Sequence, residues 1–132
     1  MKSLEIKWQR LIYKNKTCPR CAKTENEIKK TVSLLKEVCR NTGIKFVLKK
    51  EKISKNEFIK NPLKSNQIFI NNKPLEEYLN AKISKTKCCD VCGPVECRTV
   101  VLDKTQFEVI PKEIIIKAGI IAISEILKGA YK

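Results

Sequence analysis

The spacing of apolar residues in the first third of the chain changes period twice. Over residues 4–13 apolar side chains first alternate with polar ones and then run together, which predicts a strand. Over about residues 19–41 they recur at steps of three and four, which predicts an amphipathic helix, and Gly43 stands where such a helix is commonly capped. Alternation returns over residues 44–50. A second strand is therefore expected after the helix.

Capping and turn residues divide the middle of the chain into short elements. Ser54 and Glu57 have the spacing of a capping box, in which each side chain accepts a hydrogen bond from the backbone of the other residue. Pro62 cannot continue the helix that this box begins. The elements expected here are a helix from residue 55, a strand at 67–70, a turn at 71–72 and a helical turn at 75–79.

Residues 80–98 differ from the rest because they hold four of the seven cysteines and few large apolar side chains. We expect them to form a cysteine-rich loop instead of a regular element. The elements expected after it are strands at 99–102 and 107–110 and a last helix from Pro111 to about Lys128. Apolar residues cover most of the circumference of that helix, which is typical of a helix packed on two sides or shared between a sheet and a partner.

These elements fit a single α/β domain over residues 1–132, since a chain of this length with 42% hydrophobic residues can fill one core. We expect a mixed sheet of four or five strands flanked by helices. The cysteine-rich loop is expected before a terminal hairpin and a hydrophobic C-terminal helix.

The chain is strongly basic, with 28 lysines and arginines against 14 acidic residues and a net charge of +14. The lysines are spread along the whole sequence and aromatic residues amount to 6%, so no stacking platform for nucleic acid is predicted. Such a charge predicts solubility and weak, non-specific binding to polyanions. The charged N-terminus and the short apolar stretch at residues 114–127 predict a cytoplasmic protein that does not enter a membrane.

Histidine is absent from the chain. This absence excludes, within the chain itself, a histidine general base, a Cys-His or Ser-His catalytic pair and an imidazole ligand to a metal. Seven cysteines in a reducing compartment instead indicate redox-active thiols or thiolate ligands to a metal.

The CPRC motif, Cys18-Pro19-Arg20-Cys21, stands where the first helix is predicted to begin. The N–H groups and the positive end of a helix dipole stabilise a thiolate, which lowers a cysteine pKa from about 8.5 toward neutrality. Arg20 adds a positive charge that favours the thiolate further. Cys18 is therefore the predicted nucleophile, and Cys21 is close enough to resolve a mixed disulfide. Half of a metal site is the competing interpretation of the pair.

The strand, the CPRC motif and the helix resemble the active-site unit of the glutaredoxin and thioredoxin-like superfamily, whose small members carry C-P-x-C. A second segment, SNQIFINNK at residues 65–73, is similar to a glutaredoxin segment. The resemblance covers residues 4–79 and implies a three-layer thioredoxin-like fold. It also implies a thiol-disulfide oxidoreductase that acts on protein or small-molecule thiols and needs no cofactor for its cysteine pair.

The glutaredoxin segment has a proline at the position of Asn66. That proline is cis in the superfamily and helps to present the substrate backbone to the cysteine pair. The resemblance therefore implies that Asn66 occupies the substrate-docking position. Because asparagine replaces the proline, a residue that hinders metal binding beside the pair is also missing.

The second cysteine cluster, between residues 88 and 97, is not explained by this resemblance. Cys89-x-x-Cys92 followed by glycine is typical of a metal knuckle. Cys97 supplies a third thiolate, and Cys88 or a cysteine of the CPRC motif supplies the fourth. Thiolates without imidazole suit zinc first, and also an iron-sulfur cluster, Cu(I), arsenic(III) or mercury(II). A dithiol relay that exchanges with the CPRC pair and a disulfide that only pins the loop are the other interpretations.

Two functions from different classes are therefore expected. The first is a cytoplasmic thiol-disulfide oxidoreductase that uses the CPRC pair, with the second cluster as a metal site or a redox relay. The second is a non-enzymatic protein that binds zinc or another soft metal through thiolates. A homodimer formed through the C-terminal helix is a further possibility.

The seventh cysteine, Cys39, lies on the apolar face of the first predicted helix, and we expect it to be a core residue.

Overall fold

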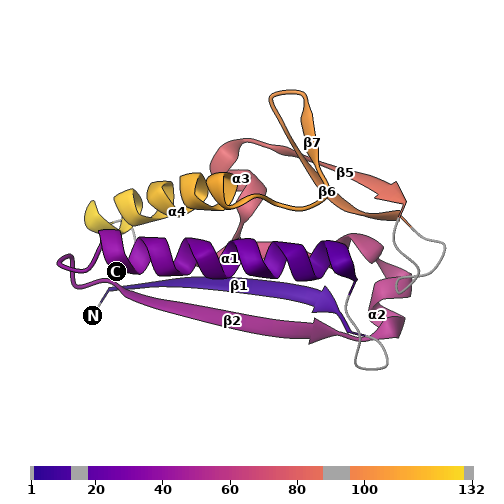
Figure 1. Ribbon diagram of the computed structural model, residues 1–132, viewed down its shortest axis with the longest axis horizontal. Coiled ribbons are helices and arrows are strands. Elements are labelled where there is room, and N and C mark those ends of the chain that lie inside the picture. The colour runs from indigo at the N-terminus through magenta and orange to yellow at the C-terminus, as the bar shows by residue number, and fades with distance from the viewer. Residues whose placement is uncertain (1, 13–17, 88–95, 130–132) are drawn as a thin grey trace.

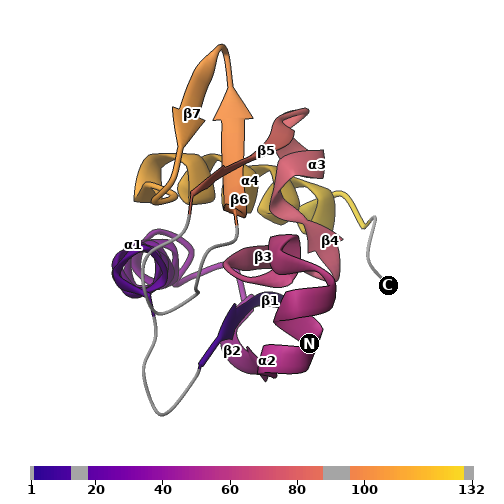
Figure 2. The ribbon, with the colours of Figure 1, turned by 90° about the vertical axis from the view of Figure 1, so that its right-hand side faces the viewer.

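The computed structural model describes residues 2–12, 18–87 and 96–129 (Figure 1). It contains a four-stranded mixed sheet (Figure 2). The strands lie in the order β2-β1-β3-β4, with β1 parallel to β2 and β3 antiparallel to both β1 and β4. The strand bounds are Ser3–Leu11 for β1, Lys45–Ile53 for β2, Gln67–Ile70 for β3 and Lys73–Pro74 for β4. The predicted mixed sheet is confirmed.

The alternation of β1 determines which of its side chains enter the core. Leu4, Ile6 and Trp8 are no more than 1% exposed, and Arg10 follows them on the same face of the strand. The helix that follows β1 ends at Val38 with Cys39 as its C-cap residue, so the predicted end near residue 41 with Gly43 as the cap is wrong.

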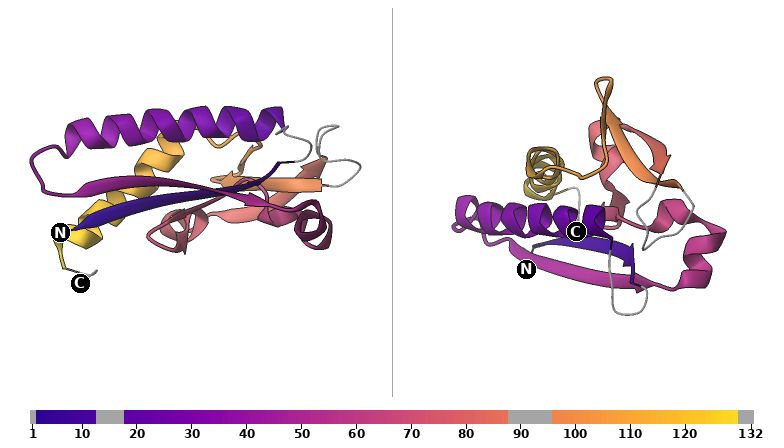
Figure 3. Two further views of the ribbon diagram at one scale, coloured as in Figure 1. Left: turned by 90° about the horizontal axis from the view of Figure 1, so that it is seen from below. Right: turned by 45° about the vertical axis from the view of Figure 1, so that its right-hand side comes forward.

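α1 (Pro19–Val38) joins β1 to β2, and α2 (Lys55–Lys60) with the 3-10 turn η1 (Pro62–Lys64) joins β2 to β3. The two helices lie on opposite sides of β1 and β2 (Figures 2 and 3). The predicted capping box begins α2. The Ser54 hydroxyl accepts the Glu57 N–H at 3.1 Å, and the Glu57 carboxylate accepts the Ser54 N–H at 3.2 Å.

The expectation that residues 80–98 form a loop is wrong at both ends of that segment. β5 (Lys82–Lys87) and β6 (Glu96–Leu102) are antiparallel strands, and β7 (Thr105–Phe107) completes a second sheet in the order β5-β6-β7. β5 has the sequence KISKTK, whose side chains are exposed or half-buried. Because β5 has few apolar residues, it lacks the alternation that identifies a half-buried strand in a sequence. The strand is held by backbone pairing with β6.

The remaining predicted elements agree more closely with the structure. Asp103 and Lys104 form the predicted turn, with φ values of 49° and 69°, although the strand after it is Thr105–Phe107 where 107–110 was expected. α3 (Leu75–Leu79) has the predicted bounds, and α4 (Lys112–Leu127) follows Pro111 as expected. None of the helices in the described part of the chain is long and apolar enough to cross a membrane.

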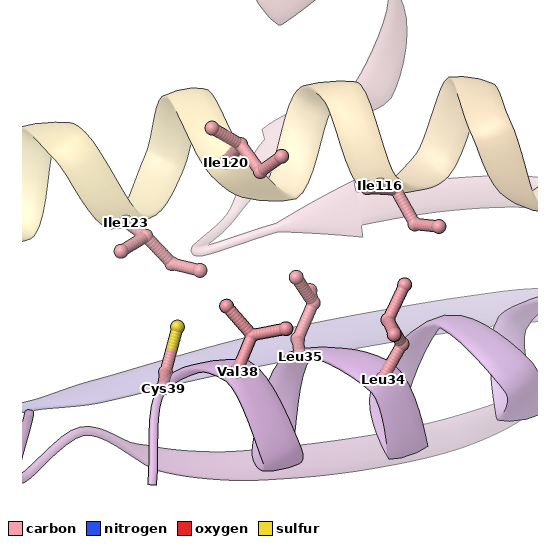
Figure 4. A pocket seen from close by; sticks show the side chains of 7 residues that line it. All are labelled: Leu34, Leu35, Val38, Cys39, Ile116, Ile120 and Ile123. Atoms are coloured by element: carbon pink, nitrogen blue, oxygen red, sulfur yellow. The ribbon is translucent and has the colours of Figure 1, made fainter. Parts of the chain in front are cut away.

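α4 packs against α1, and side chains of the two helices face each other across the contact (Figure 4). Gly119 permits a close approach, because a Cβ atom there would lie 2.9 Å from Cδ1 of Leu35. The start of α4 is held by Glu27 of α1, whose carboxylate accepts the backbone N–H of Lys112 at 3.2 Å and pairs with Lys30 at 3.3 Å.

These bonds make the docking of α4 sensitive to acid. The N–H of Lys112 lowers the pKa of Glu27, burial opposes that shift, and Lys30 adds to it. A lowered pKa in the folded state means that the stabilisation is complete above the unfolded value of about 4.5 and is lost as pH falls through the folded value. The free energy of unfolding should therefore fall between pH 6 and pH 3, and we expect this fall to be about 0.3–1 kcal/mol smaller in Glu27→Gln than in wild type. Urea unfolding near pH 6 and pH 3 measures it. The exposed Glu37→Gln variant is the control, and equal acid sensitivity in wild type and Glu27→Gln would contradict the expectation.

Candidate functional site

The CPRC turn lies at the N-terminus of α1, as predicted. Cys18 is the N-cap residue, with φ −62° and ψ 141°, and its carbonyl oxygen accepts the N–H of Ala22 at 2.9 Å. Cys21 lies in the first helical turn, and both cysteines are reduced and 3% exposed. That turn contains no acidic residue, so its own side chains do not offset the positive end of the helix dipole. This is the local environment that favours a thiolate.

Cys21 contacts a hydroxyl from the segment that precedes β3. Its Sγ atom lies 3.8 Å from Oγ of Ser65, and the same oxygen accepts the N–H of Leu11 at 3.0 Å. Because the backbone donates to this oxygen, the Ser65 proton is available to the Cys21 sulfur. Sequence reasoning missed Ser65, since a single serine carries no signal until β1, α1 and the turn before β3 come together.

Asn66, at the predicted substrate-docking position, is buried and bonded within the protein. Its φ of 61° is a left-handed conformation that asparagine adopts more readily than most residues. Its Oδ1 accepts the indole N–H of Trp8 at 2.9 Å, and its Nδ2 donates to Oγ1 of Thr24 at 3.2 Å. These bonds fix the turn before β3 against β1 and α1, next to the Ser65–Cys21 contact. A docking role for Asn66 stays a prediction.

Arg20 extends from α1 to the second sheet. Its Nη2 donates to Oγ1 of Thr86 at 2.7 Å and to the carbonyl oxygen of Lys87 at 3.2 Å, and it forms an ion pair with Glu108. Its Nη1 is buried with no hydrogen-bond partner. Glu108 neutralises much of the charge that was expected to act on Cys18, so the tuning role of Arg20 stays a prediction. The structure assigns Arg20 a second task, which is to join the start of α1 to β5.

This contact brings the flanks of the second cysteine cluster to the CPRC turn. β5 ends at Lys87 and β6 begins at Glu96, and Thr86 pairs directly with Cys97 across the two strands. Cys97 is buried and disulfide-bonded. The other predicted members of the cluster, which lie outside the described residues, are Cys88, Cys89 and Cys92.

A soft-metal site at the second cluster stays a prediction. Among residues 2–12, 18–87 and 96–129, no three acidic or cysteine side chains form a group that could hold a metal ion. Cys97 becomes a thiolate ligand only after its disulfide is reduced. A site for zinc or another soft metal would therefore need side chains beyond the described residues.

β1 contributes a charged residue that sequence reasoning missed. Arg10 is 9% exposed, and its guanidinium lies 4.9 Å from the centroid of the Trp8 ring. Its Nη1 is buried with no hydrogen-bond partner, and no carboxylate of the described residues pairs with it. A signal was present, because the alternation that places Leu4, Ile6 and Trp8 in the core places Arg10 on the same face.

Cys39 is buried, as expected, at the opposite end of α1 from the CPRC turn. It lines an apolar groove of about 310 Å³ between α1 and α4, shown in Figure 4. Val38 and Ile120 on the walls of this groove are 70% and 55% exposed. A homodimer through the C-terminal helix would use this face, and it stays a prediction.

Comparison with known proteins identifies the family of the chain. A family model described as a domain of unknown function, DUF2703, matches residues 4–119. A protein of Archaeoglobus fulgidus described as an uncharacterized protein is 38% identical over 112 residues, which cover 85% of this chain and 82% of the relative. No solved structure matches. The chain therefore belongs to the DUF2703 family.

Proposed function

We propose that the protein is a thiol-disulfide oxidoreductase of thioredoxin and glutaredoxin type, with Cys18 as nucleophile and Cys21 as resolving thiol. The observation that carries this proposal is the position of both reduced cysteines at the start of a 20-residue helix. The contact between Cys21 and the Ser65 hydroxyl supports it, because the hydroxyl can donate a hydrogen bond to the sulfur once the thiolate forms, and such a bond favours the thiolate.

The chain path supports a thioredoxin-like fold for this function. A parallel pair, β1 and β2, is joined by α1, and an antiparallel pair, β3 and β4, completes the sheet. Helices on both faces give the three layers that the CPRC resemblance implies. The second sheet, β5-β6-β7, is then an addition to that fold, inserted before the last helix.

The exchange consists of two balanced steps. The Cys18 thiolate attacks one sulfur of a substrate disulfide, which forms a mixed disulfide and releases the other substrate sulfur as a thiolate. The Cys21 thiolate then attacks the Cys18 sulfur, which forms the Cys18–Cys21 disulfide and releases the second substrate thiol. An external dithiol returns the pair to its reduced form. This chemistry suits a reducing, cytoplasmic compartment.

A dithiol relay is the role that we propose for the second cluster. Arg20 donates a hydrogen bond to Thr86 of β5, and Thr86 pairs with Cys97 of the neighbouring strand β6. The Arg20–Thr86 hydrogen bond therefore connects the segment that carries the Cys18 and Cys21 thiols to the strand pair that carries the disulfide of Cys97. Attack of the Cys18 thiolate on that disulfide, followed by resolution through Cys21, would oxidise the CPRC pair and release both cysteines of that disulfide as thiols.

Reduction of insulin with dithiothreitol as the electron donor tests the oxidoreductase proposal. We expect the wild-type protein to accelerate precipitation of the insulin B chain well above the dithiothreitol background. Failure to accelerate this precipitation with either dithiothreitol or reduced glutathione as the electron donor would refute the oxidoreductase proposal.

The alternative function, thiolate binding of zinc or another soft metal, is separated by metal analysis and thiol counting on protein purified without oxygen. One tightly held ion with four protected thiols would favour the metal-binding protein. Absence of metal together with a reversible Cys18–Cys21 disulfide would favour the oxidoreductase.

A further inference from the structure

Arg10 carries a buried charge that takes no part in the exchange steps described for Cys18 and Cys21. Its side chain is more than nine-tenths buried against the Trp8 ring, and its Nη1 atom has no hydrogen-bond partner. A buried guanidinium without an ion pair is strongly unfavourable unless it stabilises an anion nearby. The position of Arg10 in the fold indicates which anion that is.

The register of β1 indicates that Arg10 lies beneath the first turn of α1. Trp8 and Arg10 share a face, and Trp8 is linked through Asn66 to Thr24 of α1. Two residues along a strand advance about 6.6 Å, and a helix rises about 1.5 Å per residue. α1 runs antiparallel to β1 (Figure 1), so the step from Trp8 to Arg10 matches about four residues from Thr24 back along the helix. That point is the CPRC turn.

The bonds of the neighbouring residues agree with this placement. The backbone N–H of Leu11, the residue after Arg10, donates to Oγ of Ser65 at 3.0 Å. The same Oγ lies 3.8 Å from Sγ of Cys21. The end of β1 and the CPRC pair are therefore joined by a single hydroxyl group.

Among the described residues, the other charged side chains whose contacts tie them to the turn are Arg20 and its partner Glu108. Arg20, from α1, is ion-paired with Glu108, which follows β7. Lys87, from β5, meets Arg20 through its carbonyl oxygen. Among the described residues that face the turn, Arg10 is the buried cation that lacks a counter-charge.

We propose that Arg10 is the positive charge that holds the thiolate of the CPRC pair, and that it does so more strongly than Arg20. The inference rests on the proposed function. Deprotonation of Cys18 creates an anion at a site that is 3% exposed, where loss of hydration opposes the charge. The guanidinium that the register of β1 brings toward this turn would compensate for that loss. Arg10 acts on Cys18 through its charge, and the Trp8 ring holds the guanidinium in place.

The test is the pH dependence of alkylation of Cys18 by iodoacetamide, read by mass spectrometry of the Cys18 peptide. We expect Arg10→Met to raise the pH of half-maximal alkylation by about 1 unit or more, which lowers the rate near neutral pH about tenfold. Arg10→Lys, which keeps the charge, should retain most of the wild-type profile. Circular dichroism identifies folded variants, and Arg10→Gln replaces Arg10→Met if the latter does not fold.

Two controls separate the local charge from the net charge and from general loosening. Arg40→Met removes an exposed arginine beyond the far end of α1 and should leave the Cys18 profile unchanged. Cys39, measured in the same samples, reports general changes in thiol access and should not respond to Arg10→Met. Arg20→Met should shift the Cys18 profile less than Arg10→Met, because Glu108 already pairs with Arg20.

An unchanged Cys18 profile in Arg10→Met, an equal shift at Cys39, or a larger shift in Arg20→Met would overturn the inference. These outcomes differ from failure of the proposed function. A profile that depends on Arg10 without any insulin reduction would remove the oxidoreductase proposal and leave the inference standing. Insulin reduction together with a Cys18 profile that does not depend on Arg10 would overturn the inference and leave the oxidoreductase proposal standing.

Discussion

Replacement of Cys18 by serine is expected to abolish the catalysed reduction of insulin and to lower its rate to the level of the dithiothreitol background. The expectation follows from chemistry, because a serine hydroxyl at the start of α1 cannot attack a disulfide under these conditions. The fold should survive, since Cys18 and serine are close in size and serine is a favoured N-cap residue. The measurement is the initial rate of insulin precipitation for wild type and variant at equal concentration.

Two further cysteine variants make this result specific. Cys21→Ser should keep the first attack and lose the second, so that a mixed disulfide between Cys18 and a substrate thiol accumulates and is visible by intact mass. Cys39→Ser is the matched control, because Cys39 is reduced and buried at the other end of α1. A Cys18→Ser variant that retains full activity, or a Cys39→Ser variant that loses it, would contradict the assigned roles.

Replacement of Arg98 by methionine should lower the free energy of unfolding by about 3–5 kcal/mol, the range for breaking a buried ion pair. Arg98 lies beside Cys97 in β6 and is 8% exposed. Its Nη1 donates to Oε1 of Glu76 at 2.9 Å, and its Nε donates to the carbonyl oxygen of Leu63 at 2.7 Å. The substitution leaves the Glu76 carboxylate half-enclosed without its partner and separates β6 from α3 and η1.

For a chain of this length the loss corresponds to a fall in Tm of about 10 °C or more, which calorimetry measures directly. Arg40→Met is the control, because Arg40 and Glu37 are both 69% exposed and such pairs contribute little. The double variant Arg98→Met with Glu76→Gln should recover part of the loss, since the uncompensated charge is then removed. An Arg98→Met variant with a Tm within about 2 °C of wild type would contradict the role of this pair.

The first sheet and its helices could be predicted because local signals and burial agree there. The stripe of Leu4, Ile6 and Trp8 identifies the central strand, and the Ser54 capping box fixes the start of α2. The second sheet could not be predicted in the same way. Lys82–Lys87 has few apolar residues, and its strand depends on pairing with β6, a long-range contact that the local sequence does not encode.

The candidate site shows the same division. The CPRC motif indicates a helix start and a cysteine pair by itself, and the structure places both there. Alternation along β1 indicates that Arg10 faces the core, but the relation of Arg10 and Ser65 to the pair depends on which face of β1 meets α1. The position of Arg20 in the motif predicts an effect on the thiolate, whereas its contact with Glu108 depends on a residue almost ninety positions further along the chain.

The central claim, that Cys18 and Cys21 form a reversible redox pair, is tested most directly by a redox titration with peptide-resolved thiol labelling. Protein equilibrated in glutathione buffers of graded potential is quenched, labelled and digested, and the state of the two cysteines is read in one peptide. We expect Cys18 and Cys21 to convert together between dithiol and disulfide at a midpoint between about −180 and −270 mV, the range from protein disulfide isomerase to thioredoxin. Cysteines that remain thiols at every potential, or that become labelled only after a metal is removed, would contradict it.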